Sequence, residues 1–443
     1  MRTEQRMSPD HVQPGTVNDF IEPADVSLTK RPKARGPESG RPSWRWSPAS
    51  PGFRFWAGVL LVLCSAYSVT CLTLAARLPS GAPFGDWLAL WTWARFLVEH
   101  PTTEMYDPSI LHAGQAAAGL EASQYYPFAY PPSFLLVLWP MGLLPSGVAY
   151  GALLVLSLPL YLWATVGKRW RSPVTLAALI APTTAISIVA GQTGFLASAL
   201  LIGGLRLAGR RPILAGLLLG LLTYKPQIGL LVPVALVSAK LWRCAASACA
   251  TFLLLFAVTS AAFGPGIWVT WFAAIPGFSS QVAAEGGRIL HLMPTVMSTL
   301  LQIGAPPTAA RLAQGAATIA IMGVVWASFR AGPTRLAAAT LLVGTLLATP
   351  YAFLYDMPIV ATAAFWVIQE RHDSGGCFGW GEILVLTIAA IAPMTMPAEA
   401  ARPPVSAISL VLLLGVILRR SWMLRHPAES ETATQALHCG TAS

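Results

Sequence analysis

The sequence predicts an all-α membrane protein that crosses the bilayer many times, and three observations support this. Of the 443 residues, 55% are hydrophobic and 11% are charged, whereas a soluble domain carries about 25% charged residues. Many apolar segments approach the roughly 20 residues that a helix needs to cross a bilayer. The net charge of +10 comes largely from Lys and Arg in short connections, where such charges hold membrane topology. Basic and aromatic residues do not alternate as in a nucleic-acid groove, so no nucleic-acid partner is expected.

The two ends of the chain have a different composition. Residues 1–52 are rich in Pro, Ser and charge and lack apolar periodicity, which predicts a disordered tail. This region is too long and too polar before its first apolar run for a standard cleaved signal peptide. Residues 421–443 predict a second disordered tail. The transmembrane domain is therefore expected over residues 53–420.

The apolar segments give the expected spans in chain order. The longer candidates are 55–76, 147–166, 173–190, 245–263, 308–329, 335–350, 356–370, 380–397 and 404–419. Shorter ones are 194–208, 212–224 and 226–240, and the shortest are 132–145 and 292–304. If the last two dip into the membrane without crossing it, the Lys and Arg clusters of the short loops all fall on one side. The positive-inside rule then predicts about twelve crossings of the plasma membrane, with both termini in the cytoplasm.

This topology places several regions together on the outer side. They are the long first loop 77–131, the second loop 264–293, and the short turns at 190–194, 223–227 and 349–356. Polar and charged residues that gather at one face of a membrane protein indicate a cavity open to that face. We therefore expect the functional residues in these turns and loops.

In the first outer loop, Asp86 is the most informative residue. It precedes an apolar, aromatic stretch in which Leu88, Trp91 and Phe96 predict one face of a helix lying in the membrane interface. Asp86 acts as a base or charge stabiliser at the membrane surface, or it only caps this helix. The local pattern slightly favours the capping role.

The turn "TYKPQ" places a lysine at membrane depth. Such residues face cavities or partners far more often than lipid, and Pro226 ends the preceding helix. Lys225 is therefore expected at the meeting point of two short helices, looking into an outer cavity where an ammonium suits a phosphate. The alternative is a lysine that extends to the outer headgroups.

Other polar residues of the outer regions are weaker candidates. Gln192 in "AGQTG" binds a substrate hydroxyl or satisfies its own turn, and Asp356 pairs with Lys225, caps its helix or touches substrate. The further candidates are Asp107, Tyr130, Arg288 and Tyr355. Arg288 is the second expected phosphate ligand. No cysteine pair has the spacing of a metal site with histidine partners, so no metal is expected.

Taken in order, these motifs resemble a known family. The order is the one found in glycosyltransferase family 87: an Asp soon after the first span is followed by "YDP", "YPP", "GQTG", "AGLLLGLLTYKPQ" and "TPYAFLYD". This is the group of integral-membrane α-mannosyltransferases that use polyprenol-phosphate mannose. The resemblance covers about residues 55–370.

The resemblance implies a fold and a reaction. The fold would be GT-C, and the reaction would transfer a hexose, typically mannose, from a polyprenyl-phosphate carrier to a lipid or glycan acceptor at the outer face. It would proceed with inversion and without a metal or cofactor. Asp86 matches the position of the general base and Lys225 the position that holds the carrier phosphate. Several members carry histidine where this chain has Tyr355 and Asp356, which bears on the choice of acceptor and sugar.

Broken helices with charge at membrane depth are also typical of transporters and lipid flippases, which gives the alternative function. Two features argue against it. The chain has no clear internal repeat, and its unusual residues gather on one face, whereas alternating access requires a midplane site. A scaffold without activity is a third possibility. Sugar transfer predicts bond cleavage in the donor, while transport predicts intact substrate crossing a sealed vesicle.

Overall fold

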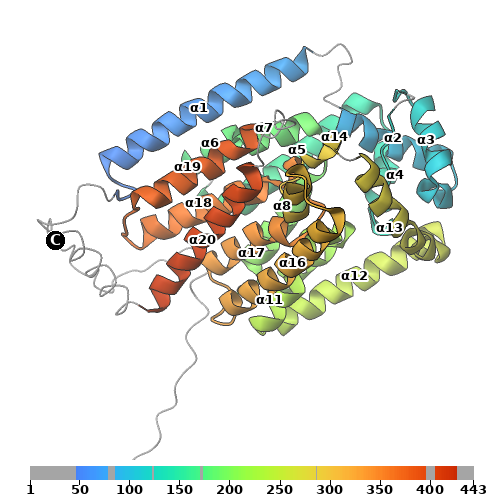
Figure 1. Cartoon of the computed structure of the whole chain (residues 1–443). Helices are drawn as coiled ribbons and strands as arrows, with labels where there is room; N and C mark the ends of the chain where they lie inside the picture. The colour runs from blue at the N-terminus through green and yellow to red at the C-terminus, as the bar shows by residue number, and fades with distance from the viewer. Residues whose placement is uncertain are drawn as a thin grey trace, which may run out of the picture.

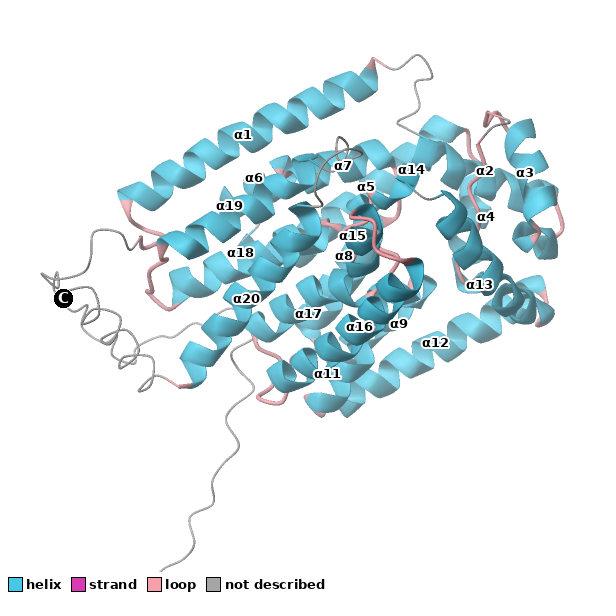
Figure 2. Ribbon diagram, viewed as in Figure 1, coloured by secondary structure: helices cyan, strands magenta, loops and turns pink. Residues whose placement is uncertain are grey.

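The computed structural model describes residues 46–77, 85–121, 124–169, 173–285, 287–395 and 405–426. Within these ranges the chain is all-helical and has no strand, as the sequence predicts (Figure 2). The first α-helices are α1 (Pro51–Ala76), α2 (Gly85–Glu99), α3 (Pro108–Ala117), α4 (Leu135–Gly142), α5 (Ser146–Val166), α6 (Pro173–Ile180), α7 (Pro182–Ala190), α8 (Gly194–Leu207), α9 (Pro212–Leu221) and α10 (Pro226–Gly229). The later ones are α11 (Val232–Ser238), α12 (Trp242–Phe263), α13 (Gly266–Glu285), α14 (Gly287–Leu290), α15 (Val296–Gln302), α16 (Pro307–Phe329), α17 (Arg335–Ala348), α18 (Pro358–Asp373), α19 (Trp380–Thr395) and α20 (Val405–Arg425). Short 3₁₀ turns include η2 (Thr102–Tyr106), η3 (Pro132–Phe134), η5 (Leu222–Tyr224) and η6 (Leu354–Asp356).

The expected number of about twelve crossings is not confirmed. In the described ranges, five helices are long and apolar enough to span a membrane: α1, α5, α12, α16 and α20. A sixth span results if α6 and α7 count as one helix, bent by 48° where Pro182 begins α7. Several other apolar segments form helical stretches of 10–17 residues, some of them made of two short helices in a row, because proline or glycine ends many of them early. The sequence pattern therefore predicts apolar segments better than it predicts complete crossings.

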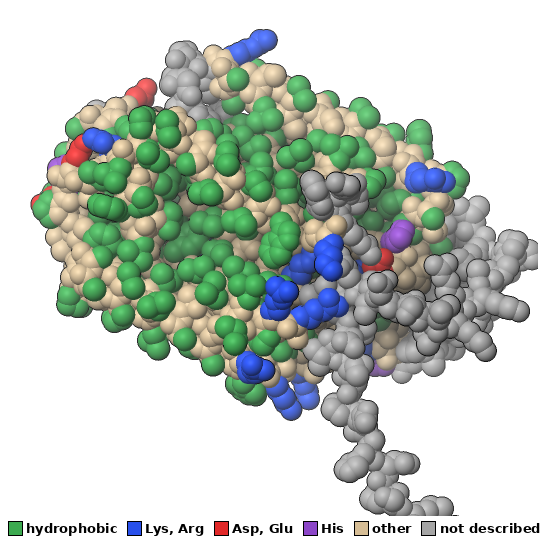
Figure 3. Space-filling view, turned by 180° about the vertical axis from the view of Figure 1, so that it is seen from behind, with side chains coloured by type: hydrophobic (Ala, Val, Ile, Leu, Met, Phe, Trp, Pro, Cys, Tyr) green, Lys and Arg blue, Asp and Glu red, His purple; other side chains and the backbone are tan. Residues whose placement is uncertain are grey.

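The helical bundle has an apolar exterior and a central helix, α17. Only 11% of the apolar window of α1 and 6% of that of α12 is buried, and these two helices lie along opposite edges of the bundle (Figure 1). Apolar side chains cover much of the surface, while Lys and Arg gather toward one end (Figure 3). In the centre, every residue of α17 from Leu336 to Ala348 is buried. These features identify a membrane protein whose outer helices face lipid.

The two expected half-segments are confirmed as too short to cross. α4 has 8 residues and α15 has 7, and helices of this length reach only roughly 10–12 Å into a core about 30 Å thick. α4 packs against α2 so closely that a Cβ on Gly142 would lie 2.0 Å from the Ala94 carbonyl oxygen. This contact ties the first outer loop to the bundle.

The helix predicted after Asp86 is present as α2. Of its predicted apolar face, Phe96 is buried, whereas Leu88 and Trp91 are only partly covered. Trp87, Leu90 and Leu97 are buried as well. α2 contacts α3, α4 and η2, so much of its surface packs against other parts of the protein.

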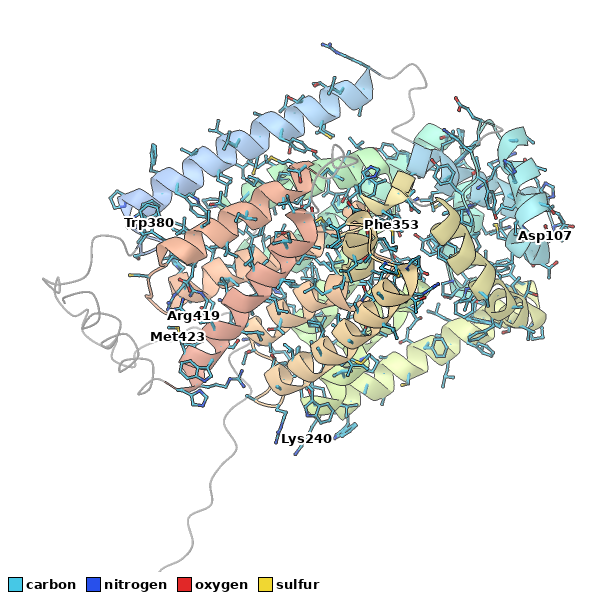
Figure 4. All side chains as sticks on the ribbon, viewed as in Figure 1. Asp107, Lys240, Phe353, Trp380, Arg419 and Met423 are labelled. Carbon is cyan, nitrogen blue, oxygen red and sulfur yellow. The ribbon has the colours of Figure 1, made fainter. Side chains whose placement is uncertain are left out.

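The opposite end of the molecule carries the basic connections. Arg206 donates to the carbonyl of Ala164 near the end of α5 (3.0 Å), and Arg420 pairs with Glu382 on α19 (2.8 Å). Figure 4 shows Arg419 at this end and Asp107 at the far side of the molecule. The charged connections and the first outer loop thus occupy different ends.

Part of the region expected as an N-terminal tail contacts the bundle. Trp46 and Phe378 exchange backbone hydrogen bonds of 2.9 and 2.7 Å, and the Trp46 ring lies 4.6 Å from that of Trp380. α1 then begins at Pro51. Residues 1–45 and 427–443, which hold most of the two expected tails, lie outside the described residues.

Candidate active site

Asp86 lies in the first turn of α2 and is half-buried. No hydrogen bond or ion pair to its carboxylate is found among the described residues. Burial raises the pKa of Asp86 from 3.8 to about 6, because a low-dielectric surrounding disfavours the charged form. An unpaired carboxyl group with such a pKa is mostly ionised at neutral pH and remains able to accept a proton.

The turn from Gly191 to Gly194 joins α7 to α8 beside Asp86. Gln192 donates from Nε2 to the backbone carbonyl of Asp86 (2.8 Å) and is 5% exposed. Gly191 has φ +64°, and a Cβ there would lie 2.6 Å from the Trp87 Cβ. A Cβ on Gly194 would lie 1.8 Å from the Tyr355 carbonyl oxygen. The two glycines therefore let this turn fit between the start of α2 and the loop that carries Tyr355.

Lys225 lies where η5 ends and Pro226 begins α10. The predicted meeting of two short helices at this residue is therefore confirmed. The predicted open cavity is not, because Lys225 is 1% exposed and its ammonium pairs with Asp356. The Tyr355 ring covers the same ammonium, with its centroid 4.9 Å from Nζ. A buried cation requires such a partner, and Asp356 provides it.

Of the roles considered for Asp356, the structure shows the pairing with Lys225, and no side chain among the described residues caps the start of α18. Asp356 pairs with Lys225, and its Oδ2 accepts from the Phe353 backbone N–H at 3.2 Å. It is 2% exposed, so both of its contacts are shielded from solvent. The loop is fixed further by Leu354, whose N–H donates to the carbonyl of Leu292 before α15 (2.9 Å).

An aromatic stack forms the next wall of the site. The Phe134 ring centroid lies 4.4 Å from that of Tyr130 and 5.1 Å from that of Tyr224, and the two tyrosine centroids are 6.4 Å apart. Burial raises the pKa of Tyr130. The nearby charge of Lys225 lowers this pKa in part, and the charges of Asp356 and Asp86 raise it. One phenol hydroxyl thus lies within electrostatic reach of all three charged groups.

Tyr355 is the second phenol of the site. Its ring stacks on Phe353 at 5.4 Å. Burial and the charges of Asp356 and Asp86 raise the pKa of Tyr355 well above 10. The structure therefore gathers Asp86, Gln192 and Lys225 with the tyrosines, as the topology predicted.

Asp107 is not brought to this group, and a second predicted residue, Arg288, cannot be compared with it. Asp107 caps α3 by accepting from the backbone N–H groups of Ser109 (2.9 Å) and Ile110 (3.2 Å), and it is exposed. Figure 4 shows Asp107 at the edge of the molecule, far from Phe353 of the site loop. Arg288 falls in α14, and its side chain lies outside the described residues.

Sequence reasoning missed the structural role of Tyr224. Its hydroxyl donates to the Thr193 carbonyl at 3.3 Å, which joins the lysine turn to the glutamine turn. Its position directly before Lys225 was a usable signal. Ser187 gave no such signal, yet its hydroxyl oxygen lies 3.2 Å from the Tyr355 carbonyl oxygen while the hydroxyl donates to the Thr183 carbonyl at 2.7 Å.

The comparison with protein families assigns the chain to a class. The model of glycosyltransferase family 87 matches residues 128–350, just over half of the chain. No curated protein and no solved structure matches the chain. The matched region contains Tyr130, Gln192 and Lys225, and the hydrogen bond from Gln192 links it to Asp86. The chain therefore belongs to glycosyltransferase family 87 and is a membrane glycosyltransferase.

Proposed function

We propose that this glycosyltransferase moves a hexose, with mannose expected, from a polyprenyl-phosphate carrier to a lipid or glycan acceptor. The GT-C fold, the outer face of the plasma membrane and cytoplasmic termini belong to the same proposal. One observation carries it: an unpaired, half-buried carboxylate, Asp86, is linked through Gln192 to the region that holds the buried Lys225–Asp356 pair. A base for an acceptor hydroxyl and a cation for a phosphate are the two groups that this transfer requires.

Asp86 would act as the general base. The acceptor oxygen attacks the anomeric carbon and forms the new C–O bond, and its proton passes to the Asp86 carboxylate. The bond from the anomeric carbon to the phosphate oxygen breaks, and its electron pair leaves with the polyprenyl phosphate. Attack opposite the leaving group inverts the anomeric carbon. Because phosphate is already a good leaving group, no second acid is needed, unlike in inverting hydrolases.

Lys225 would stabilise the negative charge on the leaving phosphate. An ammonium has three N–H donors, and Asp356 uses one of them. The remaining donors can serve phosphate oxygens while Asp356 keeps its contact. Because Lys225 is 1% exposed, the Tyr355 ring would have to move when the phosphate binds. Arg288 is proposed as a second phosphate ligand.

The remaining groups would shape the substrate pocket. Tyr130 and Tyr355 present phenol groups near Asp86, and aromatic faces of this kind suit a sugar ring. Asp356 would hold Lys225 in place. No substrate contact is proposed for Asp107, because its carboxylate caps α3.

The orientation in the membrane follows from charge. The end that carries Arg206 and Arg420 would face the cytoplasm, as the positive-inside rule requires. The site would then open to the outer side, where the lipid-linked donor reaches it from the surrounding bilayer. Membrane lipids would contact α1 and α12, which expose most of their apolar surface.

Variants of two aspartates test the proposal in isolated membranes. Asp86→Asn should abolish transfer of labelled mannose from polyprenyl-phosphate mannose, because the amide cannot accept the proton. Asp107→Asn is the matched control and should retain transfer. Normal transfer by Asp86→Asn at equal protein level would refute the base. Labelled substrate that crosses sealed vesicles without bond cleavage would refute the transferase function.

A further inference from the structure

The side-chain amide of Gln192 is only half used. Its Nε2 donates to the Asp86 carbonyl at 2.8 Å. Only the NH₂ group of an amide can donate to a carbonyl, so this bond also fixes which side of the amide carries the oxygen. Oε1 is buried and has no hydrogen-bond partner within the described part of the chain.

A buried acceptor of this kind is uncommon. Leaving it unsatisfied destabilises the folded state, and an unsatisfied group in a native structure calls for an explanation. The turn that carries Gln192 is fixed by Gly191 against Trp87 and by Gly194 against Tyr355. Oε1 therefore cannot turn toward another protein group without giving up the bond to Asp86.

The position of the turn indicates what Oε1 meets. At one side it contacts Asp86, and at the other the Thr193 carbonyl accepts from Tyr224, the residue before Lys225. In the proposed reaction the anomeric carbon lies between the attacking oxygen, near Asp86, and the leaving phosphate, near Lys225. A turn that joins these two groups lies beside the ring of the transferred hexose.

We propose that the Gly191–Gly194 turn recognises the transferred hexose, with Gln192 Oε1 accepting a hydrogen bond from one of its ring hydroxyls. The inference rests on the proposed function for the identity of the ligand. Gln192 then has two tasks: its NH₂ group holds the start of α2, and its oxygen selects a hydroxylated sugar. Because Oε1 is buried, the side chains that cover it would have to move when the sugar binds.

The experiment measures the affinity of purified protein for a short-chain polyprenyl-phosphate mannose and for its monodeoxy analogues. The wild type should bind one analogue roughly 10- to 100-fold more weakly, because loss of the partner hydroxyl leaves Oε1 unsatisfied. Gln192→Met, which has similar length and no amide, should bind that analogue and the parent compound equally. Gln192→Glu keeps an acceptor oxygen and loses the donor to Asp86, so it should still discriminate.

Each other result overturns the inference. If the wild type binds every monodeoxy analogue as well as the parent compound, the turn recognises no hydroxyl. This comparison uses the wild-type protein alone, so it does not depend on the folding of any variant. If Gln192→Met and Gln192→Glu lose discrimination alike, Gln192 only holds the Asp86 carbonyl. If the mannosyl phosphate does not bind at all, the inference fails together with the donor that it assumes.

Transfer assays on the same samples separate this inference from the proposed function. Discrimination in binding without any transfer would refute the transferase mechanism and leave the recognition intact. Transfer without discrimination between the analogues would support the transferase mechanism and refute the recognition by Gln192.

Discussion

The buried pair of Lys225 and Asp356 gives the sharpest stability prediction. The two residues are 1% and 2% exposed, so water cannot compensate either charge when the other is removed. Loss of one partner from a buried pair costs about 3–5 kcal/mol, whereas neutral replacement of both is often tolerated. Lys225→Met should therefore destabilise the protein by about this amount, and adding Asp356→Asn should restore most of the loss.

Thermal unfolding of the purified protein in detergent measures the effect. The single variant should unfold at a temperature lower by roughly 3–5 °C, and the double variant should return most of the way to the wild type. Lys240→Met is the control, because Lys240 is exposed and its loss should leave the unfolding temperature unchanged. If the single and double variants unfold at the same lowered temperature, the pair does not hold the loop as described. The double variant should nevertheless lack transfer activity, because it no longer has the proposed phosphate ligand.

Three further predictions concern individual residues. Burial raises the pKa of Asp86 to about 6, and the base works as a carboxylate. Therefore kcat/KM for transfer should rise with pH up to about 6 and level off above it. A profile that is flat from pH 5 to 7 would contradict this. Gly194→Ala should abolish folding or transfer, since a Cβ would lie 1.8 Å from the Tyr355 carbonyl oxygen, whereas Gly147→Ala, which has no neighbour within 4 Å, should leave both intact; an active Gly194→Ala would show that the turn can shift. Asp107→Ala should lower thermal stability slightly through loss of the α3 cap and keep full transfer, and loss of transfer at normal stability would return Asp107 to the site.

The sequence predicted which residues come together at this site, but not how their charges are paired. Loop charges and segment lengths placed Asp86, Gln192 and Lys225 on one face, because those signals depend on chain order and hydropathy alone. They could not show that Asp356 would neutralise Lys225, since a contact across 131 residues leaves no local trace. Likewise, the face that α2 buries depends on its packing against α4, which no periodicity within α2 reveals.

The order of motifs and the hydropathy pattern predicted different properties of the chain. The order of short motifs was sufficient for the family, which the match over residues 128–350 confirms. The number of crossings was not predictable in the same way, because a proline such as Pro182 divides an apolar run into two helices that are bent against each other. Hydropathy sums over such a break and does not detect it.

The choice of sugar donor tests the central claim most directly. Membranes that contain the wild-type protein, Asp86→Asn or no protein are incubated with radiolabelled polyprenyl-phosphate hexoses and, separately, with nucleotide-linked hexoses, and transfer to endogenous acceptors is counted. We predict transfer from a polyprenyl-phosphate hexose that requires both the protein and Asp86. Transfer that uses only a nucleotide sugar, or that is the same with Asp86→Asn, would contradict the proposed function.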